Sequence, residues 1–248
     1  MKKTVLISGG SRGIGRATAI AMAKKGWQVA YTFRSGIEAA KQTKMFIEDT
    51  GGKAFLIQGD TSSEADVLAA FDETHKFFGS LDAVVVNAGV VAPSMPLSEM
   101  PIERLQMMFN TNVLGSFLFA REASRRLPSQ KVGKTGSIVL VSSAAARLGS
   151  PFEYVDYAAS KGAMDTLTLG LSKELASQNI RVNAVRPGLI ETEIHASGGQ
   201  PDRAERLGQN VPMARPGTAQ EIADAIAWLC SDEASYCTGS ILDIAGGR

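Results

Sequence analysis

The chain has 248 residues, of which 44% are hydrophobic and 21% are charged, with 26 Lys and Arg against 25 Asp and Glu. This composition is that of a globular protein, and a net charge of +1 gives no reason to expect nucleic acid or an anionic membrane as a partner. No apolar run reaches the length of a membrane span or of a secretory signal, and two cysteines are too few for a disulfide framework. We therefore expect a soluble, cytoplasmic protein.

Short apolar runs alternate with longer segments of helical periodicity along the chain. The apolar runs predict strands over residues 3–8, 28–33, 54–58, 81–87, 137–142, 181–186 and 240–244. The periodic segments predict helices over residues 14–25, 38–50, 65–78, 102–126, 155–177 and 219–229. Most of the apolar runs are uninterrupted, which is typical of strands buried on both faces of a parallel sheet. The alternation predicts a doubly wound, seven-stranded parallel α/β sheet of the Rossmann type, with helices on both faces.

Residues 192–216 show no clear periodicity and are rich in glycine, proline and charged side chains. An irregular segment of roughly 20 residues inside a compact domain is more often functional than a packing element. No repeat, low-complexity tract or linker divides the rest of the chain. We expect one domain over residues 1–248, in which residues 192–216 form a substrate lid.

The first predicted strand leads directly into the sequence Gly9-Gly10-Ser11-Arg12-Gly13-Ile14-Gly15, and helical periodicity follows at once. Glycines let the backbone turn tightly and approach a ligand, and a helix N-terminus presents free N–H groups and the positive end of its dipole. The spacing is not that of a P-loop, which also needs Gly-Lys followed by Ser or Thr. The turn therefore predicts a phosphate site formed by Gly9, Ser11, Arg12, Gly13, Ile14 and Gly15.

The same residues also fit the G-x-S-x-G pattern of a serine hydrolase, in which Ser11 would be the nucleophile. That mechanism needs a histidine, and the chain has only His75, in a polar helical stretch, and His195, in the predicted lid. A nucleophile after the very first strand would also lack the preceding strand–helix loop that supplies an oxyanion hole. The sequence favours the phosphate site over this alternative.

A second cluster consists of Tyr157 and Lys161, which lie four residues apart in a predicted helix and therefore on one helix face. A phenol has an ordinary pKa near ~10, and a neighbouring ammonium group lowers that pKa by favouring the phenolate. Ser143 directly follows a predicted strand, where its hydroxyl is placed to hydrogen-bond a substrate oxygen. These three side chains are candidates for a proton-transfer site.

Together, these features resemble the short-chain dehydrogenase/reductase family over nearly the whole chain. The motifs that carry the resemblance follow the family's order: Gly9, Gly13 and Gly15; Asp60; Asn87-Ala88-Gly89; Asn112; Ser143; Tyr157 and Lys161; Pro187-Gly188; and Asp243-Ile244-Ala245-Gly246-Gly247. The stretch from Gly149 to Tyr157 is similar to members described as glucose 1-dehydrogenase-like or 3-oxoacyl-(acyl carrier protein)-reductase-like. The sequence departs from the family's pattern at two places. The gap from Ser143 to Tyr157 is longer than usual, which leaves Ser142 as a lesser candidate for the role of Ser143. Val86 stands where asparagine is common.

The resemblance implies hydride transfer between a nicotinamide and a small carbonyl or alcohol substrate. Tyr157 would be the general acid in carbonyl reduction and the base in alcohol oxidation, while Lys161 would lower its pKa and hold the nicotinamide ribose. Ser143 would polarise the carbonyl, and Asn112 would support a water relay to Lys161. The resemblance also implies a homotetramer, assembled through the long predicted helices.

By the same resemblance, further residues would contact the cofactor. Asp60 and Thr61 would meet the adenine, Asn87, Ala88 and Gly89 the adenosine-side ribose, and Pro187, Gly188, Ile190 and Thr192 the nicotinamide and pyrophosphate. The few histidines and cysteines are scattered along the chain, so we expect no metal site.

The end of the second predicted strand distinguishes NAD from NADP. NAD-preferring folds place Asp or Glu there to bind the adenosine ribose, whereas this chain reads Tyr31-Thr32-Phe33-Arg34-Ser35. Arg12 and Arg34 can converge on a 2′-phosphate, a group that guanidinium binds well. The sequence thus predicts an NADP(H)-dependent oxidoreductase. A non-catalytic NADP-binding protein remains an alternative, and the substrate stays open.

Overall fold

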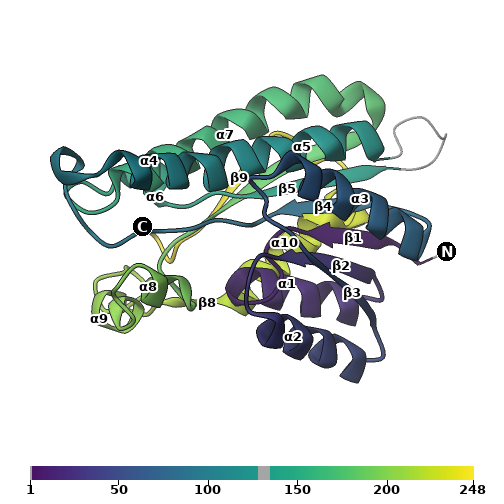
Figure 1. Ribbon diagram of the computed structural model, residues 1–248, viewed down its shortest axis with the longest axis horizontal. Coiled ribbons are helices and arrows are strands. Elements are labelled where there is room, and N and C mark those ends of the chain that lie inside the picture. Colours follow the sequence, from purple (N-terminus) through teal and green to yellow (C-terminus); the bar gives the residue numbers. More distant parts are fainter. Residues whose placement is uncertain (1, 128–134) are drawn as a thin grey trace.

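A seven-stranded sheet runs through the part of the chain that the computed structural model describes, residues 2–127 and 135–248 (Figure 1). Its strands are β1 (Thr4–Ile7), β2 (Gln28–Phe33), β3 (Lys53–Gln58), β4 (Ala83–Val86), β5 (Gly136–Val141), β6 (Ile180–Pro187) and β9 (Ile241–Ile244). They lie in the order β3-β2-β1-β4-β5-β6-β9, and every neighbouring pair is parallel. The predicted doubly wound parallel α/β sheet is confirmed.

The central strands are mostly apolar because both of their faces are covered. Every residue of β1, β4 and β5 is buried. The chain builds β1, β2 and β3 outward in one direction and then returns to build the other half of the sheet from β4. Open α/β sheets bind ligands at such a switch point, beyond the carboxyl ends of the strands. The topology therefore places a binding site where β1 and β4 end.

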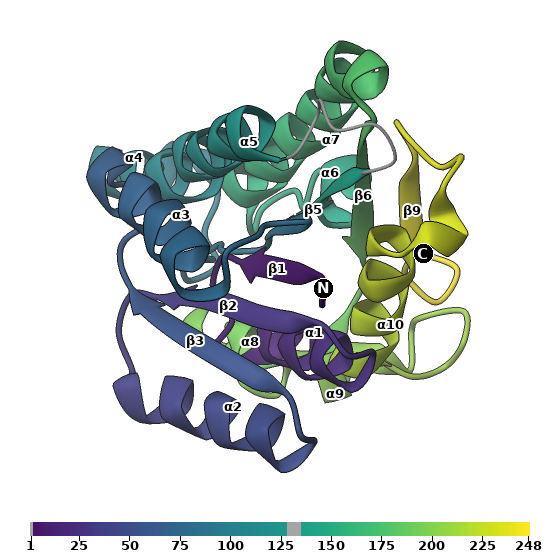
Figure 2. The same ribbon diagram turned by 90° about the vertical axis from the view of Figure 1, so that its right-hand side faces the viewer.

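Two layers of helices cover the sheet (Figure 2). The longer helices are α1 (Gly13–Lys24), α2 (Ile37–Asp49), α3 (Glu64–Phe78), α4 (Ile102–Phe109), α5 (Gly115–Arg126), α7 (Val155–Leu175) and α10 (Ala219–Cys230). On one face α1, α2 and α10 form a core that includes Met22 and Ile226. On the other face α3, α5 and α7 form a second core that includes Phe71 and Phe119.

The helix predicted over residues 102–126 is interrupted in the structure. A π-helical turn, Asn110–Leu114, separates α4 from α5. Within this turn, the Asn112 Oδ1 accepts from the Val90 N–H over 2.8 Å, and the Asn112 Nδ2 donates to the Val90 carbonyl over 2.9 Å. The turn therefore joins the helix layer to the chain beyond β4. Apolar periodicity cannot reveal it, because π-turns add a residue without breaking the helix.

The predicted lid, residues 192–216, is more ordered than the sequence suggests. The short elements in and beside it are β7 (Ile190–Glu191), α8 (Ile194–Ser197), α9 (Arg203–Gly208) and β8 (Gly217–Thr218), and α6 (Ala145–Leu148) is a further short helix. β7 pairs with β8 in parallel, which brings the two ends of the segment together. Leu189, Ala204 and Val211 form a small apolar cluster of their own. The expected irregular segment thus contains two helices, each too short to show a periodicity in sequence.

Within residues 2–127 and 135–248, no helix combines the length and the apolarity that crossing a membrane requires. In the same ranges, no three or more His, Cys, Asp or Glu side chains are grouped so that they could hold a metal ion.

Candidate active site

A cavity of about 460 Å³ opens at the carboxyl edge of the sheet, where β1, β4, β5 and β6 end. All the residues that the sequence places around the cofactor line it: Gly9, Ser11, Arg12, Gly13, Ile14, Gly15, Arg34, Asp60, Thr61, Asn87, Ala88, Gly89, Tyr157, Lys161, Pro187, Gly188, Ile190 and Thr192. Ser143 lines it as well, whereas Asn112 is fully buried beside Gly89 and does not reach the cavity.

The glycine turn between β1 and α1 leaves space and donors for an anion. Gly9 and Gly13 have φ angles of 69° and 52°, in the left-handed region that favours glycine. A Cβ on Gly15 would lie 2.1 Å from the Gly9 carbonyl oxygen, so no side chain fits there. The N-cap residue Arg12 makes no side-chain cap, and the first turn of α1 contains no acidic residue. The helix therefore offers uncapped N–H groups and a positive dipole end to a ligand such as a pyrophosphate.

Asn87 ties the end of β4 to this glycine turn. Its side-chain amide donates to the carbonyl oxygens of Ser8 and Gly9, each over 2.9 Å, and its backbone N–H donates to the Ser8 hydroxyl over 2.9 Å. Val86, which departs from the family's usual asparagine, is the buried last residue of β4. The structural amide of the motif is therefore supplied by Asn87.

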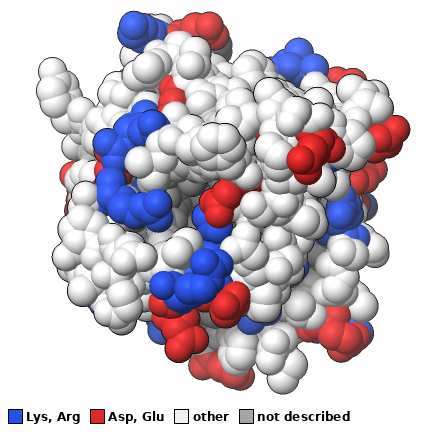
Figure 3. Space-filling view, turned by 90° about the vertical axis from the view of Figure 1, so that its left-hand side faces the viewer, with Lys and Arg blue, Asp and Glu red and all other residues white. Residues whose placement is uncertain are grey.

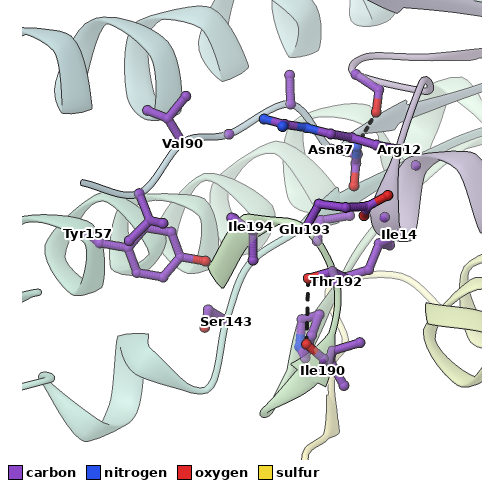
Figure 4. Close-up of a pocket in the computed structure, with 18 of the residues that line it drawn as sticks. Arg12, Ile14, Asn87, Val90, Ser143, Tyr157, Ile190, Thr192, Glu193 and Ile194 are labelled. Carbon is purple, nitrogen blue, oxygen red and sulfur yellow. Dashed lines mark hydrogen bonds between the residues drawn. The ribbon is translucent and has the colours of Figure 1, made fainter. Parts of the chain in front are cut away.

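Tyr157 and Lys161 lie one turn apart on α7, and Ser143 follows the end of β5. Figure 4 shows the Tyr157 hydroxyl and Ser143 on the same side of the cavity. The Lys161 Nζ lies 5.7 Å from the centre of the Tyr157 ring and donates to the Val141 carbonyl over 2.8 Å. The Ser143 Oγ accepts from the Ala145 N–H over 3.1 Å, which leaves its own O–H to donate to a ligand. Two hydroxyls thus face the cavity above a buried lysine.

Two buried polar residues, Ser142 and Asn112, hold the elements that carry Ser143, Tyr157 and Lys161. The Ser142 hydroxyl is buried and donates to the Lys161 carbonyl over 3.0 Å, so it holds α7 against β5. The Asn112 Nδ2 also lies 3.1 Å from the Ser160 hydroxyl on α7. A Cβ on Gly89 would lie 3.4 Å from both the Asn112 Oδ1 and the Lys161 Nζ, in contact with both polar groups.

The pKa values of the two titratable groups differ from the sequence-based expectation. Lys161 was expected to lower the pKa of Tyr157. In the structure burial raises the pKa of the Tyr157 phenol, and the neighbouring Ser143 hydroxyl opposes that rise. Burial also lowers the pKa of Lys161 to about 8, partly offset by the charge of Asp165. The physical reason is that both groups lie in a desolvated corner, where the ammonium group bonds to a carbonyl instead of to the phenol.

Arg34 and Asp60 lie at the opposite end of the cavity, beyond β2 and β3. The Arg34 guanidinium is 3.8 Å from the Asp60 carboxylate, and its side chain is 58% exposed. Burial by itself would raise the pKa of Asp60, but hydrogen bonds from Ser62 and the charge of Arg34 together hold that pKa below its usual range. The carboxylate therefore stays charged, and the loose contact leaves the guanidinium available to a ligand.

The sequence marks Glu193 and Arg203 only as charged residues of the predicted lid, and it assigns no role to several other residues that line the cavity. Val90, Leu148, Ile194 and Tyr154 form an apolar wall there, and Glu193, Arg203 and Arg248 add charge. The Glu193 carboxylate lies beside the glycine turn, 3.6 Å from where a Cβ of Gly13 would be (Figure 4). Most of these residues lie in loops, short helices or the lid, where neither motif nor periodicity marks them.

The serine-hydrolase alternative finds no support in this geometry. The Nε2 of His195 lies 2.8 Å from the Ile190 carbonyl, and burial lowers the pKa of this imidazole. The carbonyl of Ser11 accepts from Arg16 and Thr43, which fixes it as part of the glycine turn. Within the described residues, no histidine is hydrogen-bonded to Ser11.

A parallel sheet with a glycine turn and with serine, tyrosine and lysine at one edge defines a nicotinamide-dependent oxidoreductase. A family model described as enoyl-(acyl carrier protein) reductase matches residues 9–248. The chain belongs to the short-chain dehydrogenase/reductase family, as the sequence predicts.

Its relatives include enzymes of different names. The chain is 52% identical to "Uncharacterized oxidoreductase YgfF" of Escherichia coli over 243 residues, covering 98% of both chains. It is 34% identical to "Glucose 1-dehydrogenase 2" of Bacillus subtilis over 99% of this chain and 94% of the relative. Among solved structures, 3-ketoacyl-(acyl-carrier-protein) reductase from Brucella melitensis complexed with NADH matches with a TM-score of 0.91 and 31% identity, over 99% of this chain and 98% of that one. The predicted likeness to both subgroups is confirmed.

Proposed function

We propose that this protein is an NADP(H)-dependent reductase or dehydrogenase that interconverts a carbonyl and an alcohol. One observation carries the proposal: Ser143, Tyr157 and Lys161 line the same cavity as the uncapped N-terminus of α1 and Arg34. The cavity therefore offers proton-transfer groups at one end and anion-binding groups at the other.

The residues present fit a dinucleotide. The glycine turn would hold its pyrophosphate, Asp60 and Thr61 its adenine, and Lys161 its nicotinamide ribose. When bound, the nicotinamide supplies or accepts the hydride. The Ser143 hydroxyl donates to the carbonyl oxygen of the substrate, and Tyr157 delivers a proton to that oxygen in reduction and takes it back in oxidation. Asn112 holds the chain at Val90 and so keeps the wall beside Lys161 in place.

The preference for NADP(H) rests on the end of β2. No acidic side chain follows Phe33, and Arg34 and Arg12 both line the cavity. Arg34 is largely exposed and only loosely paired with Asp60, so it is free to bind a 2′-phosphate. The NADH named with the Brucella reductase is a property of that protein.

The test is a paired titration of the protein with NADPH and NADH, followed by nicotinamide fluorescence. We expect NADPH to bind more tightly, and Arg34→Asp to reduce the preference at least tenfold, about 1.4 kcal/mol, because it replaces a phosphate ligand with a repelling charge. Lys2→Asp, which makes the same change of charge before the amino end of β1, is the control and should bind like the wild type.

Equal binding of the two cofactors by the wild type would contradict the NADP(H) assignment, and binding of neither would contradict the enzyme class. The same samples can also distinguish an enzyme from a protein that binds the cofactor without catalysis. With a panel of carbonyl compounds, Tyr157→Phe should still bind NADPH but lose turnover, because it retains the ring and lacks the transferable proton.

A further inference from the structure

The end of the cavity beyond Ser143 and Tyr157 combines an apolar wall with an arginine. Val90, Leu148 and Ile194 line this end, and so do Tyr154 and Arg203. Tyr154 opens the turn before α7, and Arg203 opens α9 within residues 192–216. Arg203 therefore lines the same cavity as the Ser143 and Tyr157 hydroxyls.

Arg203 has a pair of donors that the protein does not use. Its Nη1 donates to the Glu153 Oε1 over 3.0 Å and to the Gln200 Oε1 over 3.2 Å, and its Nη2 donates to the Glu153 Oε2 over 2.6 Å. A guanidinium has five N–H donors, so the Nε–H and one Nη2–H remain. Within the described residues no acceptor is hydrogen-bonded to either group, and the Nε is not fully buried. These two N–H groups are parallel and match the two oxygens of a carboxylate.

The guanidinium is also held firmly in place. It lies 5.0 Å from the centre of the Tyr154 ring, and its side chain is only 15% exposed. The Tyr154 hydroxyl in turn accepts from the Gln200 Nε2 over 2.7 Å. A rigid donor pair loses little entropy when it binds an anion, so the arrangement is suited to recognition.

Glu153 compensates the charge of Arg203, and several arginines stabilise its carboxylate. The hydrogen bond from Arg203, and then the charges of Arg206 and Arg248, hold the pKa of Glu153 below its usual range. Arg248 lines the cavity as well, and its carbonyl accepts from the Arg147 Nη2 over 2.8 Å. The space-filling view of this side shows basic side chains on both sides of a hollow (Figure 3). Arginine and acidic side chains thus lie together at this end of the cavity, where Arg203 pairs with Glu153 and Arg206 with Asp202.

Resting on the proposed function, we infer that the substrate is a carbonyl compound with a carboxylate, separated from the reacting carbonyl by a short apolar segment. Arg203 binds the carboxylate through its Nε–H and Nη2–H edge, and Arg248 adds a second positive charge. The apolar wall contacts the segment between the two polar ends. Arg203 is therefore a specificity-determining residue.

A binding experiment tests this without turnover. Hexanoate and hexanamide have the same size and differ in charge, and their affinities are compared by calorimetry on the free protein and on the protein saturated with NADPH, where the phosphate site is occupied. We expect hexanoate to bind at least tenfold more tightly than hexanamide to both forms. Hexyl phosphate is the third ligand, and tighter binding of it to the NADPH-saturated protein would overturn the choice of a carboxylate.

Two substitutions on either side of one ion pair should shift the preference in opposite directions. Arg203→Met should lower the preference for hexanoate over hexanamide to less than threefold, because the donor pair is gone. Glu153→Gln should instead raise this preference at least threefold above that of the wild type, because a competing negative charge is gone. Arg203→Lys, which retains the charge without the paired donors, should give an intermediate value. Arg125→Met, on the outer surface of α5, is the matched control and should leave the preference unchanged.

A purely structural ion pair would instead weaken both ligands equally in both variants, and that result would overturn the inference. Equal binding of hexanoate and hexanamide by the wild type would also overturn it. The NADPH titration of the same samples keeps the two proposals separate. Loss of NADPH binding contradicts the proposed function, while the carboxylate preference is still measured on the free protein.

Discussion

At the scale of single residues, burial drives both Tyr157 and Lys161 toward their neutral forms. The pKa of the phenol rises and the pKa of the ammonium group falls to about 8, because each loses hydration in the same corner. Lys161 therefore changes charge not far above neutral pH. The protonation of Lys161 should therefore affect the free energy of unfolding of the cofactor-free protein as well as catalysis.

We expect the free energy of unfolding of the wild type to increase relative to that of Lys161→Met as the pH rises. A lysine with a pKa of about 8 when folded and 10.5 when unfolded binds fewer protons in the folded state, so its contribution to the free energy of unfolding grows between those pH values. From pH 7 to pH 9.5 the difference between the two proteins should shift by about 2 kcal/mol in favour of the wild type. Urea unfolding at both pH values measures it.

Lys173→Met, an exposed lysine on the same helix, is the control and should show no such shift. A wild type and a Lys161→Met variant whose stabilities differ by the same amount at every pH would show that Lys161 titrates normally.

The residues that the sequence places around the cofactor all line the cavity, and most of them lie in the turns that follow the strands. Gly9 and Gly13 need left-handed backbone, and Asn87 must bond to a neighbouring strand, so the sequence is constrained there. Arg203 is different. Its position depends on how residues 192–216 pack onto Glu153 and Tyr154, and those contacts join residues about 50 positions apart. No local pattern encodes such a contact.

At the scale of elements, a buried ion pair joins α4 to α7. The Arg104 Nε and Nη2 donate to the Asp156 carboxylate over 2.8 and 3.0 Å, and both side chains are almost fully buried. Arg104 also donates to the Pro93 carbonyl, so the pair fixes the chain beyond β4 as well. Because Asp156 precedes Tyr157, the pair positions the start of the helix that carries the candidate acid.

We expect Asp156→Leu to lower the free energy of unfolding by about 3–5 kcal/mol, because it leaves the Arg104 charge buried without a partner. The double variant Arg104→Met and Asp156→Leu should recover much of this loss, since apolar side chains of similar volume replace a pair whose desolvation is costly. Urea unfolding of the four proteins gives the coupling energy. A double variant no more stable than Asp156→Leu alone would contradict this account.

The elements that the sequence missed share a physical cause. The π-turn at residues 110–114 and the helices α8 and α9 are shorter than the windows over which apolar periodicity becomes visible. The seven strands are instead marked individually by short runs of apolar residues, although β6 also buries Arg181 and Asn183. The fold could therefore be predicted, while the irregular segments that shape the substrate end could not.

At the scale of the whole molecule, the helix layer with α4, α5 and α7 leaves large apolar side chains exposed. Ile102, Phe109, Leu114 and Phe117 are each more than two-fifths exposed along α4, the π-turn and α5. Figure 1 shows α4 and α5 following one another along one edge of the molecule, with α7 alongside them. Exposed apolar surface of this kind is typical of a protein–protein interface. It agrees with the homotetramer that the family resemblance implies, which stays a prediction.

We expect light scattering after size exclusion to give a mass four times the 26.2 kDa of the chain. Phe117→Glu should shift the protein to smaller species, because a carboxylate would have to be buried where an aromatic ring packs. Met45→Glu, on the exposed face of α2, places the same charge away from these helices and should leave the mass unchanged. A wild type that elutes as a monomer would contradict the prediction, and a Phe117→Glu variant that keeps the full mass would place the interface elsewhere on the molecule.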